Sequence, residues 1–286
     1  MVSFTLRVVQ FLSVVALLPS LVHSVPADQS PVLAGGLGPD CFSGTKHDGK
    51  PSGKNITIAG VPTYLSEPKK GTVNVKAPKV LLFYSDVFSA FFVNNQLLQD
   101  YFATQGYYVL GPDYFFGDPI QKHTTLDLEP LDPNFDLPAW LTKSRAQAAA
   151  ALPAWVDAVK KRYGPKAQYT ASGYCFGAKY SVEQAATDQI VAGAFAHPGD
   201  LTEAHFRALT KPLLLTCAEV DSTFPAESLY RAVDVLTEEK KKYHVQIYSG
   251  TVHGFTTRAN LSDENSVWSA EEAAKSTIGW FDRFTN

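Results

Sequence analysis

The sequence predicts an α/β fold with a mostly parallel central sheet and helices on both faces. From residue 79 onward, short apolar runs of strand type alternate with stretches long enough for helices. Continuous apolar strands that alternate with helical stretches are typical of a parallel sheet covered on both sides. The chain has 286 residues, and no linker rich in Pro, Gly and Ser divides residues 56–286. One domain is therefore the favoured organisation.

The individual elements follow from the apolar pattern. Two strand-like runs, residues 56–58 and 61–65, flank Ala59-Gly60 and predict an antiparallel hairpin. The runs expected as parallel strands are 80–84, 107–110, 168–171, 191–195, 213–216 and 245–248. The stretches expected as helices are 94–105, 144–163, 179–188, 226–241 and 270–284. Pro153 lies inside one of them, so that helix is expected to be kinked or divided in two.

The first residues have the pattern of a secretory signal peptide. Arg7 precedes an apolar run from residue 8 to 18, and small residues follow up to Ser24. The run is shorter than the roughly 20 residues of a membrane-spanning helix. We therefore expect residues 1–24 to be a signal peptide, cleaved after Ser24 or Ala27, and the protein to be secreted without membrane attachment.

An N-terminal arm is expected to follow the signal peptide. Residues 25–55 are rich in Pro, Gly, Ser and Asp and show little periodicity, which is typical of an extended segment laid over the domain of residues 56–286. In a secreted protein, the sequons that begin at Asn55 and Asn260 are potential N-glycosylation sites.

The charge pattern restricts the class of partner. The chain has 25 Lys and Arg residues against 28 Asp and Glu residues, without a block of basic side chains. Nucleic acid and anionic membrane surfaces both require a concentrated positive field, so neither is expected as the main partner. The oligomeric state is left open by the sequence.

The most specific motif is Gly-Tyr-Cys-Phe-Gly at residues 173–177, between an expected strand and an expected helix. It matches the G-x-nucleophile-x-G turn of α/β-hydrolases, with Cys175 as the nucleophile. The glycines allow a sharp strand-to-helix turn, and the helix N-terminus favours a thiolate. The other interpretation is a buried cysteine in a close-packed corner.

An acid and a histidine follow in the order that this fold requires. Asp221 comes after the apolar run 213–216, and His253 comes after the run 245–248, in a loop with flanking glycines. Because the carboxyl ends of parallel strands meet at one edge of a sheet, Cys175, Asp221 and His253 are expected to converge. Asp200 is the weaker alternative for the acid.

These motifs together resemble the dienelactone hydrolase family, especially its fungal branch. Besides residues 173–177, the Asp221 segment and His-Gly-Phe at 253–255, the resemblance covers most of residues 40–285. Further matching segments are 84–88 (Tyr-Ser-Asp-Val-Phe), 94–98 (Asn-Asn-Gln-Leu-Leu), 111–119 (Gly-Pro-Asp-Tyr-Phe-Phe-Gly-Asp-Pro) and 196–198 (Ala-His-Pro).

The resemblance implies a role for each matching residue. Cys175 would be the nucleophile, His253 the general base and Asp221 the acid that orients it. The backbone N–H groups of Val87 and Phe176 would form the oxyanion hole.

Three further positions are weaker matches to the family pattern. The family has a glutamate that supports the nucleophile where this chain has Asp86, one methylene shorter. Arg258 is the counterpart of an arginine that receives a substrate carboxylate, or else a surface arginine. Arg145 is a weakly placed candidate for a second such arginine.

The sequence therefore predicts a hydrolase for a small ester or lactone, similar to carboxymethylenebutenolidase, that acts through an acyl-cysteine intermediate. The alternative is a non-catalytic or weakly active secreted member of the same fold that binds a ligand. No metal is expected, because no cluster of His, Cys and carboxylate residues has ligand spacing along the chain. No cofactor is expected either, since no G-x-G-x-x-G follows the first strand.

The chain has three cysteines, and an odd number leaves at least one thiol free or paired between molecules. The motif assigns the free thiol to Cys175. Cys41 and Cys217 are then expected to form a disulfide or to be two inert thiols.

Overall fold

The computed structural model describes residues 30–71, 76–124 and 131–285. The expected signal peptide lies outside these residues and stays a prediction. Among the described residues, no helix is long and apolar enough to cross a membrane.

An eight-stranded sheet organises the chain, as the apolar pattern predicts. Its order is β10-β9-β7-β6-β4-β5-β3-β2. Neighbouring strands among β10, β9, β7, β6, β4 and β5 pair in parallel, and β3 pairs antiparallel with both β2 and β5. The strands are β2 (Lys54–Ile58), β3 (Val61–Ser66), β4 (Lys79–Tyr84), β5 (Tyr107–Pro112), β6 (Gln168–Tyr174), β7 (Ala192–Ala196), β9 (Leu213–Val220) and β10 (Tyr243–Val252). The hairpin and all six expected parallel strands are confirmed.

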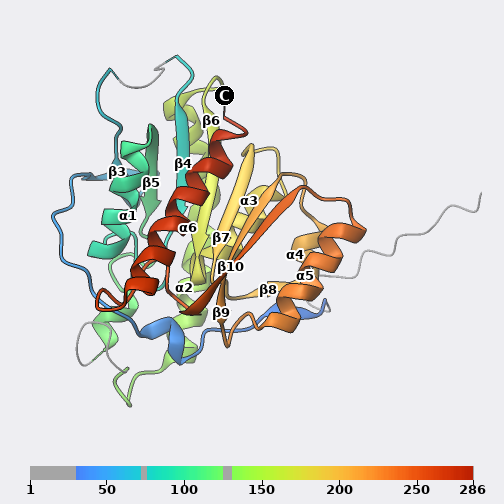
Figure 1. Ribbon diagram of the computed structural model, residues 1–286. Coiled ribbons are helices and arrows are strands. Elements are labelled where there is room, and N and C mark those ends of the chain that lie inside the picture. The colour runs from blue at the N-terminus through green and yellow to red at the C-terminus, as the bar shows by residue number, and fades with distance from the viewer. Residues whose placement is uncertain (1–29, 72–75, 125–130, 286) are drawn as a thin grey trace, which may run out of the picture.

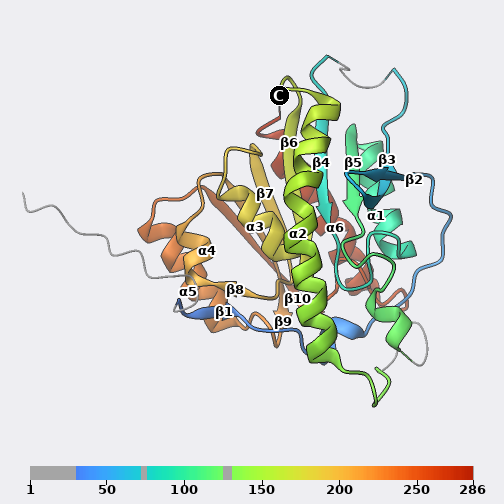
Figure 2. The same ribbon diagram turned by 180° about the vertical axis from the view of Figure 1, so that it is seen from behind.

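Helices cover both faces of this sheet. In Figure 1, α1 (Val93–Thr104) and α6 (Glu264–Asp282) cross the near face, and Figure 2 shows α2 (Leu137–Tyr163) and α3 (Ala178–Ala185) on the opposite face. The remaining helical segments are α4 (Glu203–Arg207), α5 (Ala226–Glu238) and the 3₁₀ turns η2 (Pro39–Phe42), η3 (Ile120–His123) and η4 (Cys175–Gly177). Each face has its own apolar core, and the larger one lies under α2, α3 and α5.

Helix α2 differs from the sequence prediction at its start and at its proline. It begins at Leu137, because the Asp136 carboxylate accepts a hydrogen bond of 2.9 Å from the Ala139 N–H and caps the first turn. It continues through Pro153 as one helix of 27 residues. Buried side chains on both sides of the proline, such as Leu152 and Trp155, pack into the core and hold the helix together.

The N-terminal segment runs along the edge of the sheet where the parallel strands end. Its strand β1 (Val32–Ala34) pairs antiparallel with β8 (Leu201–Thr202). The Gly35 N–H donates to the Thr223 carbonyl at 2.7 Å, and the Asp200 N–H donates to the Gly35 carbonyl at 2.9 Å. These bonds bring η2, and with it Cys41, to the edge of the sheet at which Cys175, Asp221 and His253 lie.

Pro153 gives a prediction about stability. Pro153→Ala restores an N–H inside α2 and should raise the free energy of unfolding by about 1–3 kcal/mol. Pro138→Ala is the matched control, since a proline in the first helical turn loses no helix hydrogen bond, and it should change stability by less than about 0.5 kcal/mol. Urea unfolding measures both, and an equal effect of the two substitutions would contradict this account.

Candidate active site

The turn from β6 into α3 has the strained geometry of a nucleophile elbow. Cys175 has a φ of 50°, a left-handed conformation that non-glycine residues seldom adopt. A Cβ on Gly173 would overlap the Gly177 carbonyl oxygen, and a Cβ on Gly177 would overlap the Tyr84 carbonyl oxygen. Both glycines are therefore required, because the turn packs against itself and against the end of β4.

His253 and Asp221 form a buried pair at the ends of the neighbouring strands. His253 Nδ1 lies 3.0 and 3.1 Å from the two carboxylate oxygens of Asp221. The same carboxylate accepts hydrogen bonds from the Thr223 N–H at 2.9 Å and from the Phe224 N–H at 3.1 Å. Burial alone would raise the pKa of Asp221, but the bonds from His253 and Thr223 outweigh it and lower that pKa. The alternative acid, Asp200, instead pairs with Arg145.

The partner of the other ring nitrogen of His253 is Cys41. Cys41 Sγ lies 3.4 Å from His253 Nε2. Cys41 Sγ, Cys175 Sγ and His253 Nε2 all lie within 4.8 Å of one another, and all three residues are buried. Cys41 therefore lies in the site, between the histidine and the expected nucleophile, a position that the sequence did not indicate.

The pKa values of the Cys41 and Cys175 thiols are shifted in opposite directions. A hydrogen bond from Cys175, followed by the contact with His253, lowers the pKa of Cys41 to about 5 against the opposing effect of burial. Burial and the neighbouring Cys41 raise the pKa of Cys175. Burial would lower the pKa of His253, but Asp221 and Cys41 raise it to about 9. The directions of these pKa shifts favour the negative charge on Cys41, beside His253, over a charge on Cys175.

The expectation for the other two cysteines is corrected by the structure. Cys41, Cys175 and Cys217 are all free thiols, so Cys41 and Cys217 form no disulfide. Cys217 lies buried within β9, where burial raises the pKa of its thiol, as expected of an inert cysteine. Cys41 differs from Cys217, because the arm places its thiol beside His253.

Asp86 and Arg258 form a fully buried ion pair. The Asp86 carboxylate also accepts hydrogen bonds from Asn95 Nδ2 at 2.8 Å, Thr257 Oγ1 at 3.0 Å and the Phe88 N–H at 3.1 Å. Arg258 Nε donates to the Ser43 carbonyl at 2.8 Å.

This pair bears on two of the expected roles. The oxygens of Asp86 bind Arg258 and accept hydrogen bonds from Asn95, Thr257 and the Phe88 N–H, which anchors this carboxylate, and its support of the Cys175 thiol stays a prediction. Arg258 is neither a surface arginine nor an open receptor for a carboxylate, since its guanidinium is enclosed and already paired. Arg145 remains partly exposed but is paired with Asp200.

The two expected oxyanion donors lie in segments that meet at the elbow. Val87 is in the loop after β4, and Phe176 directly follows Cys175. The close approach of Gly177 to the carbonyl oxygens of Tyr84 and Ser85 brings these segments together. The Val87 carbonyl accepts a hydrogen bond of 3.0 Å from the Ile120 N–H, which fixes the orientation of this loop.

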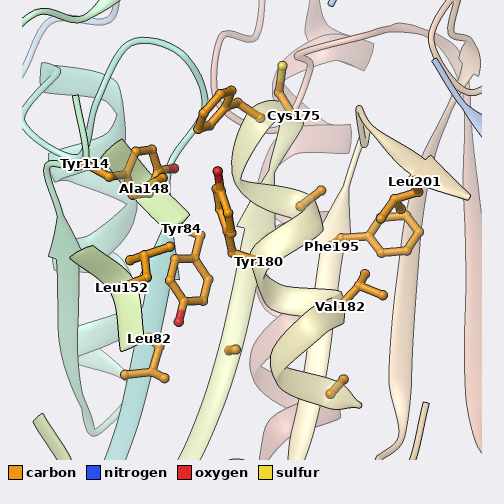
Figure 3. Packing of buried hydrophobic residues seen from close by; sticks show 14 of the residues in the cluster. Leu82, Tyr84, Tyr114, Ala148, Leu152, Cys175, Tyr180, Val182, Phe195 and Leu201 are labelled. Carbon is orange, nitrogen blue, oxygen red and sulfur yellow. The ribbon is translucent and has the colours of Figure 1, made fainter. Parts of the chain in front are cut away.

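Aromatic side chains pack beside Cys175. The Phe176 ring lies 5.5 Å from the Tyr114 ring and 5.1 Å from the Phe115 ring. Figure 3 shows Cys175 at the beginning of α3, with its sulfur pointing away from Tyr84 and Tyr180. The Cys175 side chain is 0% exposed, so the site is closed in this structure.

His197 is a second neighbour of the site whose position the sequence did not reveal. Its ring centroid lies 4.9 Å from that of His253, in an edge-to-face arrangement. Burial and the charge of His253 keep the pKa of His197 well below the usual value, so His197 is expected to be a neutral packing partner of the His253 imidazole.

The two sequons lie at the surface. Asn55 is exposed on β2, the edge strand of the sheet, and Asn260 is exposed in the loop before α6. Both positions are accessible to modification, which stays a prediction.

The strand order, the elbow and the acid and histidine at the strand ends define an α/β-hydrolase fold. The model of the dienelactone hydrolase family matches residues 61–285. The chain is 35% identical to "Dienlactone hydrolase 1" of Gibberella moniliformis over 255 residues, covering 88% of this chain and 95% of that protein. The chain therefore belongs to the dienelactone hydrolase family and is a hydrolase of ester or lactone bonds.

Two further comparisons agree. "Dienlactone hydrolase 2" of the same organism is 34% identical over 244 residues, covering 85% of this chain and 92% of that protein. A crystal structure titled as a putative dienelactone hydrolase from Klebsiella pneumoniae has a TM-score of 0.64 at 18% identity and covers 82% of this chain and 100% of that chain. At this identity the structural likeness supports the fold.

The elbow gives a test of its packing. Gly177→Ala should lower the free energy of unfolding by about 1–3 kcal/mol, because the new methyl group meets a rigid backbone carbonyl. Gly279→Ala in α6 is the control, since a Cβ there has nothing within 4 Å. This substitution should raise the free energy of unfolding by about 0.5–1 kcal/mol. Thermal or urea unfolding measures both, and a Gly177→Ala protein as stable as the wild type would refute the close approach.

Proposed function

We propose that this hydrolase cleaves carboxylic ester or lactone bonds by covalent catalysis, with Cys175 as the nucleophile. The observation that supports this most strongly is the line of contacts from Asp221 through His253 and Cys41 to Cys175, which ends at a strained elbow. A base that is oriented by a carboxylate and lies next to a cysteine at a helix N-terminus is the arrangement that activates a thiol.

The first chemical step forms an acyl-cysteine. The Cys175 thiol passes its proton to the sulfur of Cys41, which lies between Cys175 and the imidazole, and the Cys175 thiolate attacks the carbonyl carbon. The carbonyl electrons move to the oxygen, which the N–H groups of Val87 and Phe176 stabilise. When the tetrahedral intermediate collapses, the C–O bond breaks and the alkoxide takes a proton from His253.

The second step consumes water. His253, now neutral, takes a proton from a water molecule that attacks the thioester carbonyl. The C–S bond breaks and the acid leaves. Cys41 then returns its proton to the sulfur of Cys175, and His253 keeps the proton taken from water, so the resting site is restored. Asp221 keeps the imidazole oriented and stabilises its charge in both steps.

The surroundings of Cys175 favour an uncharged, apolar acyl group. Tyr114, Phe115 and Phe176 pack at this point, while the guanidinium of Arg258 is already paired with Asp86. Because Cys175 and Cys41 are fully buried, substrate entry requires the contacts that cover them to open.

A burst experiment with p-nitrophenyl acetate tests the nucleophile and the base. Cys175→Ala should lose the burst and reduce turnover by at least about 10³-fold. His253→Gln should accumulate acyl-enzyme, because deacylation then lacks its base and slows by about 10²–10⁴-fold.

Cys217→Ala is the control for these variants, because this thiol lies inside β9 and should not affect the reaction. Unchanged hydrolysis by Cys175→Ala would overturn the proposal. If the wild type hydrolyses nothing in a panel of lactones and esters, the chain is instead a ligand-binding member of the family.

Cys41 has a separate test in the same assay. If its sulfur passes the proton, Cys41→Ala should slow the burst and leave the deacylation rate constant unchanged. If the burst and deacylation slow equally, the substitution has disturbed the structure of the site, and the proposed proton transfer through Cys41 is contradicted.

We also propose that the protein is exported and processed. Expressed in a eukaryotic host, the protein in the medium should begin at Val25 or Asp28, which N-terminal sequencing determines. Digestion with an N-glycosidase should reduce its mass, and Asn55→Gln and Asn260→Gln should each remove one glycan. Retention inside the cells with Met1 intact would contradict this proposal.

A further inference from the structure

The fold assembles three ligands for a soft metal ion from residues that lie far apart in the sequence. Cys41 comes from the arm, Cys175 from the elbow and His253 from the loop after β10. Their ligand atoms lie within 4.8 Å of one another, and all three side chains are buried. The spacing along the chain could not indicate this group, because its members are separated by more than 70 residues at each step.

The one distance that is defined closely, from Cys41 Sγ to His253 Nε2, matches a tetrahedral zinc site. Zn–S bonds of about 2.3 Å and Zn–N bonds of about 2.0–2.1 Å place a sulfur and a nitrogen about 3.5 Å apart and two sulfurs about 3.8 Å apart. The observed distance from Cys41 Sγ to His253 Nε2 is 3.4 Å. Cys175 Sγ lies within 4.8 Å of both atoms, so its distance to each exceeds the ideal value by at most about 1.3 Å.

The groups behind the ligands also suit a metal. His253 would bind through Nε2, and its Nδ1 lies 3.0 Å from Asp221. Zinc-binding histidines characteristically hold their second nitrogen against a carboxylate in this way. Two thiolates balance the charge of Zn²⁺, which removes the cost of burying the ion, and a water molecule or substrate atom can supply the fourth ligand.

We propose that Cys41, Cys175 and His253 form a site for Zn²⁺ that inhibits the enzyme reversibly. Thiolate and imidazole ligands select Zn²⁺ and Cd²⁺ over Mg²⁺ and Ca²⁺, which prefer oxygen. The bound ion occupies the nucleophile and the base together and joins the arm to the edge of the sheet. The binding of the ion is independent of the hydrolytic role, and its inhibitory effect rests on the proposed function.

Metal binding is measured first without substrate. Co²⁺ added to the reduced protein should produce thiolate-to-cobalt charge-transfer absorption, and Zn²⁺ should displace it at one equivalent, while Mg²⁺ should not. Zn²⁺ affinity is obtained by competition with a chromophoric chelator. Absence of the thiolate band, or displacement by Mg²⁺ as readily as by Zn²⁺, would overturn the proposal.

Two substitutions and one control assign the ligands. Cys41→Ala should weaken Zn²⁺ binding by more than about 100-fold, because loss of a hydrogen-bond partner of a ligand already costs about 10–100-fold. Asp221→Asn, which alters only the hydrogen-bond partner of His253, should weaken Zn²⁺ binding by about 10–100-fold. Cys217→Ala, which removes a buried thiol outside the cluster, should bind like the wild type. Equal affinity of Cys41→Ala and wild type would refute the site.

A measurement on the wild type covers the case in which a variant fails to fold. Zn²⁺ should protect Cys41 and Cys175 from iodoacetamide, as read by peptide mass spectrometry, and a chelator should restore their alkylation. Zn²⁺ should also inhibit ester hydrolysis at the concentrations that give protection. Protection without inhibition leaves the metal site intact and counts against the hydrolytic role of Cys175, whereas alkylation that Zn²⁺ does not slow overturns the site itself.

Discussion

The buried ion pair of Asp86 and Arg258 connects the segments that make up the site. Asp86 follows β4, Arg258 lies in the loop that carries His253, and their partners include Asn95 of α1 and Ser43 of the arm. Removing one member of such a pair typically costs about 3–5 kcal/mol, because the other charge is left buried without a partner. This one interaction therefore connects the loop that carries His253, the loop after β4 and the arm to one another.

Cys175 is placed by a different constraint, the close contact of backbone with backbone at the elbow. Gly173 and Gly177 let α3 start directly against β6 and against the end of β4, and Cys175 takes up the resulting strain with its positive φ. Strain of this kind persists only where the surrounding structure fixes it. The elbow is fixed by close backbone packing, whereas Cys41 is positioned by the arm, a segment attached through hydrogen bonds and a short strand pair.

Much of the fold could be predicted because its signals are local. The runs of β4, β5, β6, β7 and β9 are mostly buried, as expected of strands covered on both faces, and Gly60 marks the turn of the hairpin. The starts of α2 and α6 were misplaced because Asp136 and Asp263 cap them ahead of the apolar pattern. Pro153 did not divide α2, since packing of its neighbours against the sheet outweighs the lost hydrogen bond.

The sequence by itself determined the α/β fold and the three residues that meet at the strand ends, Cys175, Asp221 and His253. These signals are local: the cysteine lies between two glycines, and the acid and the histidine each follow an apolar strand. Only the tertiary structure decided the partners of these residues. It placed Cys41 next to His253, buried Arg258 with Asp86, and kept Cys217 as a free thiol inside β9. Each of these outcomes depends on contacts between segments far apart in the chain, and neither composition nor spacing records which distant side chains share a buried space.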